Sequence, residues 1–185
     1  MTTAAILLAA GAGTRYQGGS HKLLAPLRGR RVIDWSLEHV ASATFAETIL
    51  IVGAVTFQTD AVVTTLHNPD WASGQATSLA LGIDHARTAG HDAVVVGLGD
   101  QPFVPAEAWR AVSAATSPIA VAVYEGHRGP NPVRLAAEVW PLLARDGDEG
   151  ARRLIRVRSD LVAEVTCPGS PADIDTVEDL ERWNL

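Results

Sequence analysis

The segment Leu8-Ala9-Ala10-Gly11-Ala12-Gly13-Thr14-Arg15, followed by Lys22, has the residue types of a phosphate site. Small residues let the backbone approach a ligand closely, and successive backbone N–H groups can bind phosphate oxygens. Arg15 and Lys22 add the positive charge that a phosphate chain requires. We therefore predict a triphosphate site here, and we call residues 9–13 the glycine loop.

The glycine loop differs from the two commoner phosphate-binding sequences. A P-loop requires G-x-x-x-x-G-K-[ST], and the dinucleotide fingerprint requires G-x-G-x-x-G. Tyr16 stands at the third glycine position of the fingerprint, and no Lys-Ser or Lys-Thr pair follows. The combination of glycines with Arg15 and Lys22 is more specific than a glycine turn alone.

A second chemical candidate is the segment Gly97-Leu98-Gly99-Asp100-Gln101-Pro102, which follows a strongly apolar run. A carboxylate at the end of a buried strand is well placed to hold Mg²⁺, which takes one or two carboxylates together with phosphate oxygens. A turn aspartate before a proline is the alternative interpretation of Asp100. The presence of the glycine loop in the same chain favours the metal role.

Short apolar runs alternate with amphipathic segments, and these elements must position both candidates. The pattern predicts strands over residues 4–9, 47–52, 62–66, 93–96, 119–124 and 161–165. It predicts helices over residues 32–41, 78–89, 105–115, 135–144, 149–157 and 176–183, the last capped by Thr176. This alternation indicates an α/β fold with a mainly parallel sheet covered on both faces. Ligands bind outside the carboxyl ends of such strands, where the glycine loop and Asp100 would meet.

Length and composition restrict the class of protein. A chain of 185 residues with 47% hydrophobic and 19% charged residues is expected to fold as one domain spanning residues 1–185. Its net charge of −6 disfavours a nucleic-acid partner. The apolar start covers only residues 4–10, whereas a membrane span needs about 20 residues. The single cysteine, Cys167, cannot form an internal disulfide. We expect a cytoplasmic protein with no membrane partner.

Four motifs, in order along almost the whole chain, resemble those of the MobA-like nucleotidyltransferases. They are the glycine loop with Arg15 and Lys22, followed by residues 98–102, 147–152 (Gly-Asp-Glu-Gly-Ala-Arg) and 173–180 (Asp-Ile-Asp-Thr-Val-Glu-Asp-Leu). The most similar branch is that of the molybdenum cofactor cytidylyltransferases, called MocA. The resemblance implies a three-layer, Rossmann-like nucleotidyltransferase fold. It also implies Mg²⁺-dependent transfer of a nucleotide from an NTP to a phosphorylated acceptor, with release of pyrophosphate.

The resemblance further implies roles for individual residues. Arg15, Lys22 and Asp100 would be catalytic, and Asp175 would join Asp100 as a second metal ligand. Residues 68–78 would close over the base and ribose. The residues expected to bind the nucleotide are Leu8, Ala9, Ala10, Gly11, Ala12, Gly13, Arg15, Lys22, Asn68, Gly74 and Ser78.

The acceptor side is expected to include Asn131 and Arg152. Asn131 lies in a Pro-Asn-Pro sequence where many relatives have Gly-His-Pro. Arg152 belongs to a group of arginines that follows Glu149 at helical spacing, so surface ion pairing is the alternative role for it. Trp71, within residues 68–78, fits either the base site or the core.

The leading hypothesis is transfer of CMP from CTP to a molybdopterin-type cofactor, which a recipient molybdoenzyme would then take up. A guanylyltransferase that uses GTP is the main alternative, because guanylyl relatives tend to have glycine at the position of Ala10. A non-catalytic cofactor carrier is a third hypothesis, but a carrier has no use for a complete triphosphate and metal site. An acceptor phosphate has a second pKa of about 6 and is mostly dianionic at neutral pH, so it can attack without a general base.

Overall fold

Seven strands form one mixed sheet in the computed structural model, which describes residues 1–184. The strand order is β5-β4-β1-β6-β8-β7-β9, and of these strands β8 runs antiparallel to its neighbours. The strands are β1 (Thr3–Ala9), β4 (Glu47–Val52), β5 (Thr64–His67), β6 (Ala93–Leu98), β7 (Ile119–Tyr124), β8 (His127–Ala136) and β9 (Val162–Thr166). A separate hairpin pairs β2 (Pro26–Leu27) with β3 (Arg30–Arg31). The mainly parallel sheet that the sequence predicts is confirmed.

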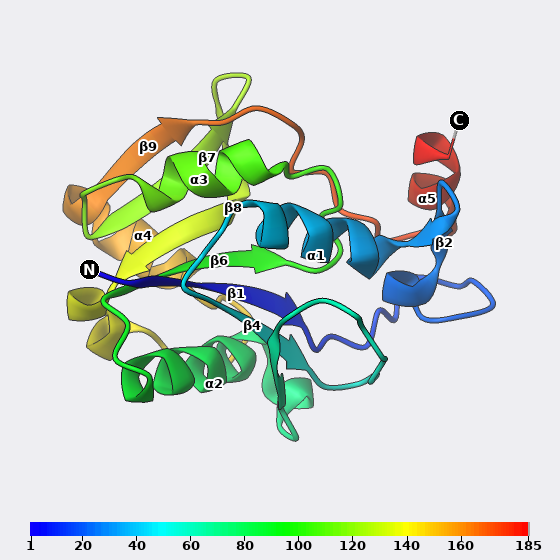
Figure 1. Cartoon of the computed structure of the whole chain (residues 1–185), viewed down its shortest axis with the longest axis horizontal. Coiled ribbons are helices and arrows are strands. Elements are labelled where there is room, and N and C mark those ends of the chain that lie inside the picture. The colour runs from blue at the N-terminus through cyan, green and yellow to red at the C-terminus, as the bar shows by residue number, and fades with distance from the viewer. Residues whose placement is uncertain (185) are drawn as a thin grey trace.

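Helices cover both faces of the sheet and make three layers (Figure 1). Successive side chains of a strand point to opposite faces. Ala5 and Leu7 of β1 therefore pack in the core with α1 (Val32–Ser42) and α3 (Ala106–Ser113). Ile6 and Leu8 pack in the opposite core with α2 (Gln75–Thr88) and α4 (Arg152–Val157). Burial on both faces explains why β1 is apolar throughout rather than alternating. No helix within residues 1–184 is long and apolar enough to cross a membrane.

A smaller third core attaches the C-terminal helix α5 (Val177–Trp183) to the β2–β3 hairpin, at one end of the molecule in Figure 1. Ile174 is fully buried in this core. The predicted cap of α5 is confirmed, because the Thr176 hydroxyl accepts from the Asp179 N–H and the Asp179 carboxylate accepts from the Thr176 N–H. Short 3-10 helices are η1 (Lys22–Leu24), η2 (Trp71–Ser73), η3 (Ala137–Leu142) and η4 (Ser159–Leu161).

The region between residues 127 and 144 departs from the sequence prediction. Strand β8 was not predicted, because its first six residues contain glycine and two prolines, which are depleted in strands. Its pairing with β6 and β7, as at Val133 opposite Val96, supplies the contacts that local sequence does not encode. The helix predicted over residues 135–144 is wrong. Residues 135–136 finish β8, and Pro141 lies within the short η3 that follows.

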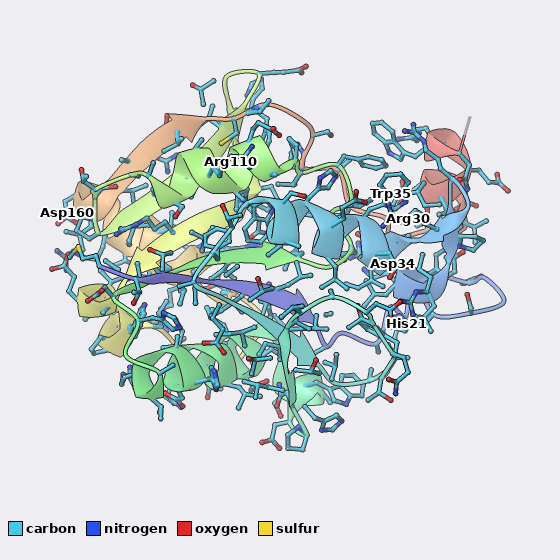
Figure 2. All side chains as sticks on the ribbon, in the orientation of Figure 1. His21, Arg30, Asp34, Trp35, Arg110 and Asp160 are labelled. Carbon is cyan, nitrogen blue, oxygen red and sulfur yellow. The ribbon has the colours of Figure 1, made fainter. Side chains whose placement is uncertain are left out.

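The arginines of the hairpin are engaged in local contacts, away from the predicted phosphate site. Arg31 donates to both carboxylate oxygens of Asp34, at 2.8 and 2.6 Å. The Arg30 guanidinium lies 4.6 Å from the ring centroid of Trp35, and Figure 2 shows both near the start of α1. These contacts fix the hairpin against α1 and leave the basic charge of the site to other residues.

Candidate active site

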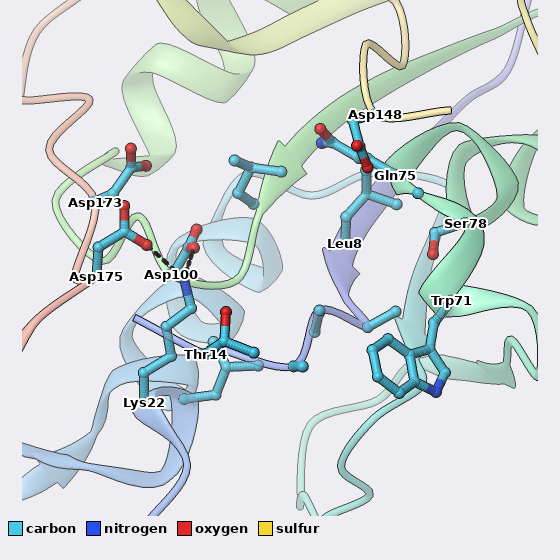
Figure 3. Close-up of a pocket in the computed structure, with 18 of the residues that line it drawn as sticks. Leu8, Thr14, Lys22, Trp71, Gln75, Ser78, Asp100, Asp148, Asp173 and Asp175 are labelled. Carbon is cyan, nitrogen blue, oxygen red and sulfur yellow. Dashed lines mark hydrogen bonds and ion pairs between the residues drawn. The ribbon is translucent and has the colours of Figure 1, made fainter. Parts of the chain in front are cut away.

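A cavity of about 500 Å³ opens at the carboxyl ends of β1 and β6. The two strands pair in parallel with Leu8 opposite Leu98, and the Gly99 N–H donates to the Leu8 carbonyl at 2.8 Å. The glycine loop and Asp100 therefore meet at this edge of the sheet, as Figure 3 shows. The start of α2, residues 148–152 and the segment before α5 contribute to the other walls.

Lys22 lies between two carboxylates from distant parts of the chain. Its Nζ donates to Asp100 Oδ2 at 2.5 Å and to Asp175 Oδ1 at 2.7 Å, and these three side chains are only 11–17% exposed. Arg15 Nη2 lies 2.9 Å from the other oxygen of Asp175. Burial alone would lower the pKa of Lys22, but the charges and hydrogen bonds of Asp100 and Asp175 outweigh it and raise this pKa. The cluster therefore holds a fully charged ammonium beside the glycine loop.

Gly13 shapes the path of the Lys22 side chain. Its φ is +62°, and a Cβ at this position would lie 3.1 Å from Cγ of Lys22 and 3.1 Å from Nε2 of His21. His21 Nε2 in turn lies 3.0 Å from the Gly11 carbonyl oxygen. Glycine is favoured here by the left-handed backbone, and its lack of a side chain leaves room for the lysine stem.

A third carboxylate, Asp173, also lines the cavity. Burial and then the charge of Asp100 raise the pKa of Asp173 to about 6, against the lowering effect of a hydrogen bond from Gln101. Ile174 lies between Asp173 and Asp175 in the sequence, and its N–H donates to the Asp100 carbonyl at 2.9 Å. This bond and the burial of Ile174 place Asp173 and Asp175 beside the loop that carries Asp100.

The opposite wall depends on contact between two glycines. Gly74 precedes α2 with a φ of +110°, and a Cβ there would lie 2.4 Å from backbone atoms of Gly147. The Ala76 N–H donates to the Gly147 carbonyl at 2.9 Å, and the Gly147 N–H donates to the Ser73 carbonyl at 3.2 Å. This junction holds Asp148 at the cavity, close to Gln75 in Figure 3.

Gly74→Ala is expected to destabilise the protein by about 3 kcal/mol, because the new methyl meets backbone that cannot move aside. Gly90→Ala is the comparison variant, since Gly90 also has a positive φ, of +79°, but has nothing within 4 Å of a Cβ. It carries only the backbone strain, about 1 kcal/mol. Chemical denaturation of both variants measures the difference, and equal losses would contradict a role for the Gly74–Gly147 contact.

Most of the residues predicted from the sequence are brought together here. The cavity is lined by the whole segment from Leu8 to Arg15 and by Lys22, Gly74, Ser78, Asp100, Arg152 and Asp175. Arg156, not Arg152, pairs with Glu149, so the surface alternative applies to the later arginine. Trp71 packs on the core and also lines the cavity, so its position is compatible with both interpretations.

Two predicted site residues do not line this cavity. Asn68 is 3% exposed, and its Nδ2 bonds to the hydroxyls of Thr77 and Ser78, both at 2.9 Å, so it shapes the entry to α2. Asn131 is 8% exposed on β8, and its carbonyl accepts from the Tyr124 hydroxyl at 3.0 Å. The sequence analysis expected Asn131 on the acceptor side, and incorporation of this segment into the sheet explains why it does not line the cavity.

Several lining residues were not singled out as site residues, although all but Leu23 belong to segments that the sequence analysis named. They are Thr14, Leu23, Ala72, Gln75, Leu98, Asp148 and Asp173. A signal existed for Asp148 and Asp173, because each belongs to a motif that carried the family resemblance. The spacing of Asp173 and Asp175 in an extended segment does not by itself show which carboxylate faces the site.

The comparison with protein families decides the broader identity. The model described as "MobA-like NTP transferase domain" matches residues 5–164. The chain belongs to this family. The MobA-like resemblance predicted from the four motifs is thereby confirmed, and with it a nucleotidyltransferase of the α/β nucleotidyltransferase fold.

The curated relatives of this MobA-like domain have names that describe different functions. The nicotine blue oxidoreductase of Paenarthrobacter nicotinovorans is 32% identical, over 96% of this chain and 94% of that protein. The purine catabolism protein PucB of Bacillus subtilis is 28% identical, over 95% and 93%. These similarities support the family and not specifically its molybdenum cofactor cytidylyltransferase branch.

Solved structures show the same fold. Rv0371c from Mycobacterium tuberculosis H37Rv superimposes with a TM-score of 0.82 and 28% identity, covering 98% of this chain and 96% of that one. A second structure of Rv0371c, described as a complex with manganese, has a TM-score of 0.80 and 26% identity, covering 99% and 98%. A divalent metal is therefore on record for a relative of this MobA-like domain.

Proposed function

We propose that this MobA-like domain transfers CMP from CTP to the phosphate of a molybdopterin-type cofactor and releases pyrophosphate. The observation that carries the proposal is the cluster of Lys22, Arg15, Asp100 and Asp175 beside the glycine loop, at the carboxyl edge of the sheet. CTP and this acceptor are supported by the resemblance of the four motifs to those of the cytidylyltransferase branch. Delivery of the product to a recipient molybdoenzyme is part of the same proposal.

The reaction needs alignment and charge neutralisation more than proton transfer. An oxygen of the acceptor phosphate attacks the α-phosphorus of the nucleotide, and a new P–O bond forms. The bond from the α-phosphorus to the bridging oxygen breaks, and pyrophosphate leaves with the electron pair. Backbone N–H groups of the glycine loop, Lys22 and Arg15 can bind the phosphate oxygens that accumulate charge.

The residues present fit Mg²⁺ as the metal. Asp100 Oδ1 is buried and has no hydrogen-bond partner within residues 1–184, so one oxygen is left for a further cation. No three His, Cys, Asp or Glu side chains in the described part of the chain are arranged to hold a metal alone. Asp100 and Asp175 would therefore hold Mg²⁺ together with substrate phosphates, as Mg²⁺ sites commonly do. The ion would neutralise charge on the transferring phosphate.

Arg152 is the best-placed residue for the acceptor phosphate. It lines the cavity from the start of α4, on the wall that also carries Asp148. It makes no ion pair with any residue of the described chain, 1–184. A free guanidinium can bind a phosphate through two parallel hydrogen bonds.

CTP is expected to be preferred over GTP by about tenfold or more, which needs about 1.4 kcal/mol of differential transition-state binding. The test measures pyrophosphate release with CTP, GTP, ATP and UTP, each with and without molybdopterin cofactor. Mass spectrometry of the pterin product identifies the nucleotide attached. Equal incorporation from CTP and GTP would contradict the cytidylyl assignment, and the absence of release with every NTP would contradict nucleotidyl transfer to this acceptor.

GTP is the second candidate for the nucleotide. The observation that favours it is the packing of Ala10. Ala10 is only 4% exposed, and its methyl lies beside Gly53, where a Cβ would be 2.9 Å from it. A Cβ at Gly53 would also lie 2.7 Å from Cβ of Trp71. A steric preference for a pyrimidine would require the Ala10 methyl to face the base, but the methyl packs toward Gly53 instead, which keeps GTP as a candidate.

A further inference from the structure

Gln101, directly after Asp100, is a buried polar residue with an unusual set of contacts. It is 2% exposed and does not line the cavity. Its Nε2 donates to Asp173 Oδ1 at 2.7 Å and to the Pro171 carbonyl at 3.0 Å. Its Oε1 is buried and has no hydrogen-bond partner within residues 1–184. The amide nitrogen of Gln101 therefore donates to two acceptors, whereas its amide oxygen accepts from no described residue.

The orientation of the Gln101 amide follows from these neighbours. A carboxylate oxygen and a carbonyl both accept hydrogen bonds, so the nitrogen must face them and the oxygen must face away. In this orientation Gln101 supplies a neutral donor to Asp173. An ionised glutamate at this position could not donate, and an apolar residue would leave both acceptors unpaired.

Backbone hydrogen bonds on either side extend the same junction. The Ile174 N–H donates to the Asp100 carbonyl at 2.9 Å, and the Ser170 N–H donates to the Phe103 carbonyl at 3.1 Å. Together with the amide of Gln101, they join residues 170–175 to the loop that follows β6. This junction sets the distance between Asp175 and Asp100, across which Lys22 donates to both.

We propose that Gln101 is a positioning residue for the transfer reaction. Its amide fixes residues 170–175 against the loop that carries Asp100, so that Asp173 and Asp175 keep their places at the phosphate site. The catalytic consequence rests on the proposed function, whereas the positional part rests on the contacts alone.

The test compares Gln101→Met and Gln101→Glu with Gln58→Met, a control at an exposed glutamine. Methionine keeps the length of the side chain and removes the donor, whereas glutamate keeps the shape and faces Asp173 with a second carboxylate. Hydrogen exchange is measured by mass spectrometry without substrate, on peptides covering residues 168–176 and on the rest of the chain. With CTP and molybdopterin, kcat, KM for CTP and the Mg²⁺ concentration that gives half-maximal rate are measured.

Both Gln101 variants are expected to exchange faster within residues 168–176 alone. The half-saturating Mg²⁺ concentration is expected to rise about tenfold or more with KM for CTP unchanged, since groups that orient metal ligands commonly change metal affinity by about 10- to 100-fold. Gln58→Met should behave as wild type.

Unchanged local exchange would overturn the positional claim, and so would faster exchange spread over the whole chain, which indicates a general packing role. Faster local exchange with unchanged kcat and Mg²⁺ dependence would overturn the catalytic claim. If the wild-type protein uses no NTP, the proposed function fails, while the exchange measurement still decides whether Gln101 positions residues 170–175.

Discussion

Asp100→Asn is expected to abolish turnover while leaving the folded structure intact. The variant keeps the volume of the side chain and removes the charge that pairs with Lys22 at 2.5 Å. It also removes the buried oxygen that has no protein partner and suits a metal ion. The loss should reach about 4 kcal/mol of transition-state stabilisation, or about a thousandfold in rate. Initial rates of pyrophosphate release measure it.

The control for this variant is Asp60→Asn, at an exposed aspartate of the loop between β4 and β5. Both proteins should give circular dichroism spectra like that of the wild type, and only Asp100→Asn should lose its rate. Turnover near the wild-type level in Asp100→Asn would refute the metal-binding role of this carboxylate. A collapse of the fold in the same variant would show that its main contribution is structural.

Lys22→Met is expected to lose turnover and also stability, because it leaves two partly buried carboxylates without their shared cation. Asp100 and Asp175 are 17% and 16% exposed, so solvent screens their repulsion poorly. Removing one partner of such a cluster costs about 3 kcal/mol. Millimolar Mg²⁺ should raise the thermal midpoint of the variant more than that of the wild type, because the ion supplies the missing charge. An unchanged midpoint without Mg²⁺ would contradict this account.

Lys22→Arg is a useful companion because the sequence has 15 basic residues and Lys22 is its only lysine. Arginine serves at every other basic position, so the charge alone does not explain the lysine. A compact ammonium can donate at 2.5 and 2.7 Å to two separate carboxylates, whereas a planar guanidinium has a different shape and donor geometry. The arginine variant should recover much of the stability and little of the turnover. Full recovery of both would show that charge alone suffices.

Features set by local sequence were predicted correctly. The unbroken apolar run of β1 indicates a strand buried on both faces, and the glycines after it indicate a turn open to a ligand. The Thr176 cap is encoded within one helical turn, since both of its partners belong to Thr176 and Asp179. Parallel pairing then brings the ends of β1 and β6 together, which is why Asp100 could be placed beside the glycine loop from the sequence.

Only the tertiary structure decided which residues complete the site. Lys22 and Asp175 are 153 positions apart, and the bond from Gln101 to Asp173 spans 72 positions. No periodicity within either segment encodes such a contact. The position of Asn131 outside the cavity has the same cause, because β8 is a strand by virtue of its partners β6 and β7, despite its own glycine and prolines. The sequence by itself determined that the glycine loop and Asp100 follow buried strands and meet at one edge of the sheet, which is the basis of the predicted phosphate site. The packing of distant segments decided that the carboxylates of Asp173 and Asp175 lie at this edge and that the buried amide of Gln101 contacts Asp173.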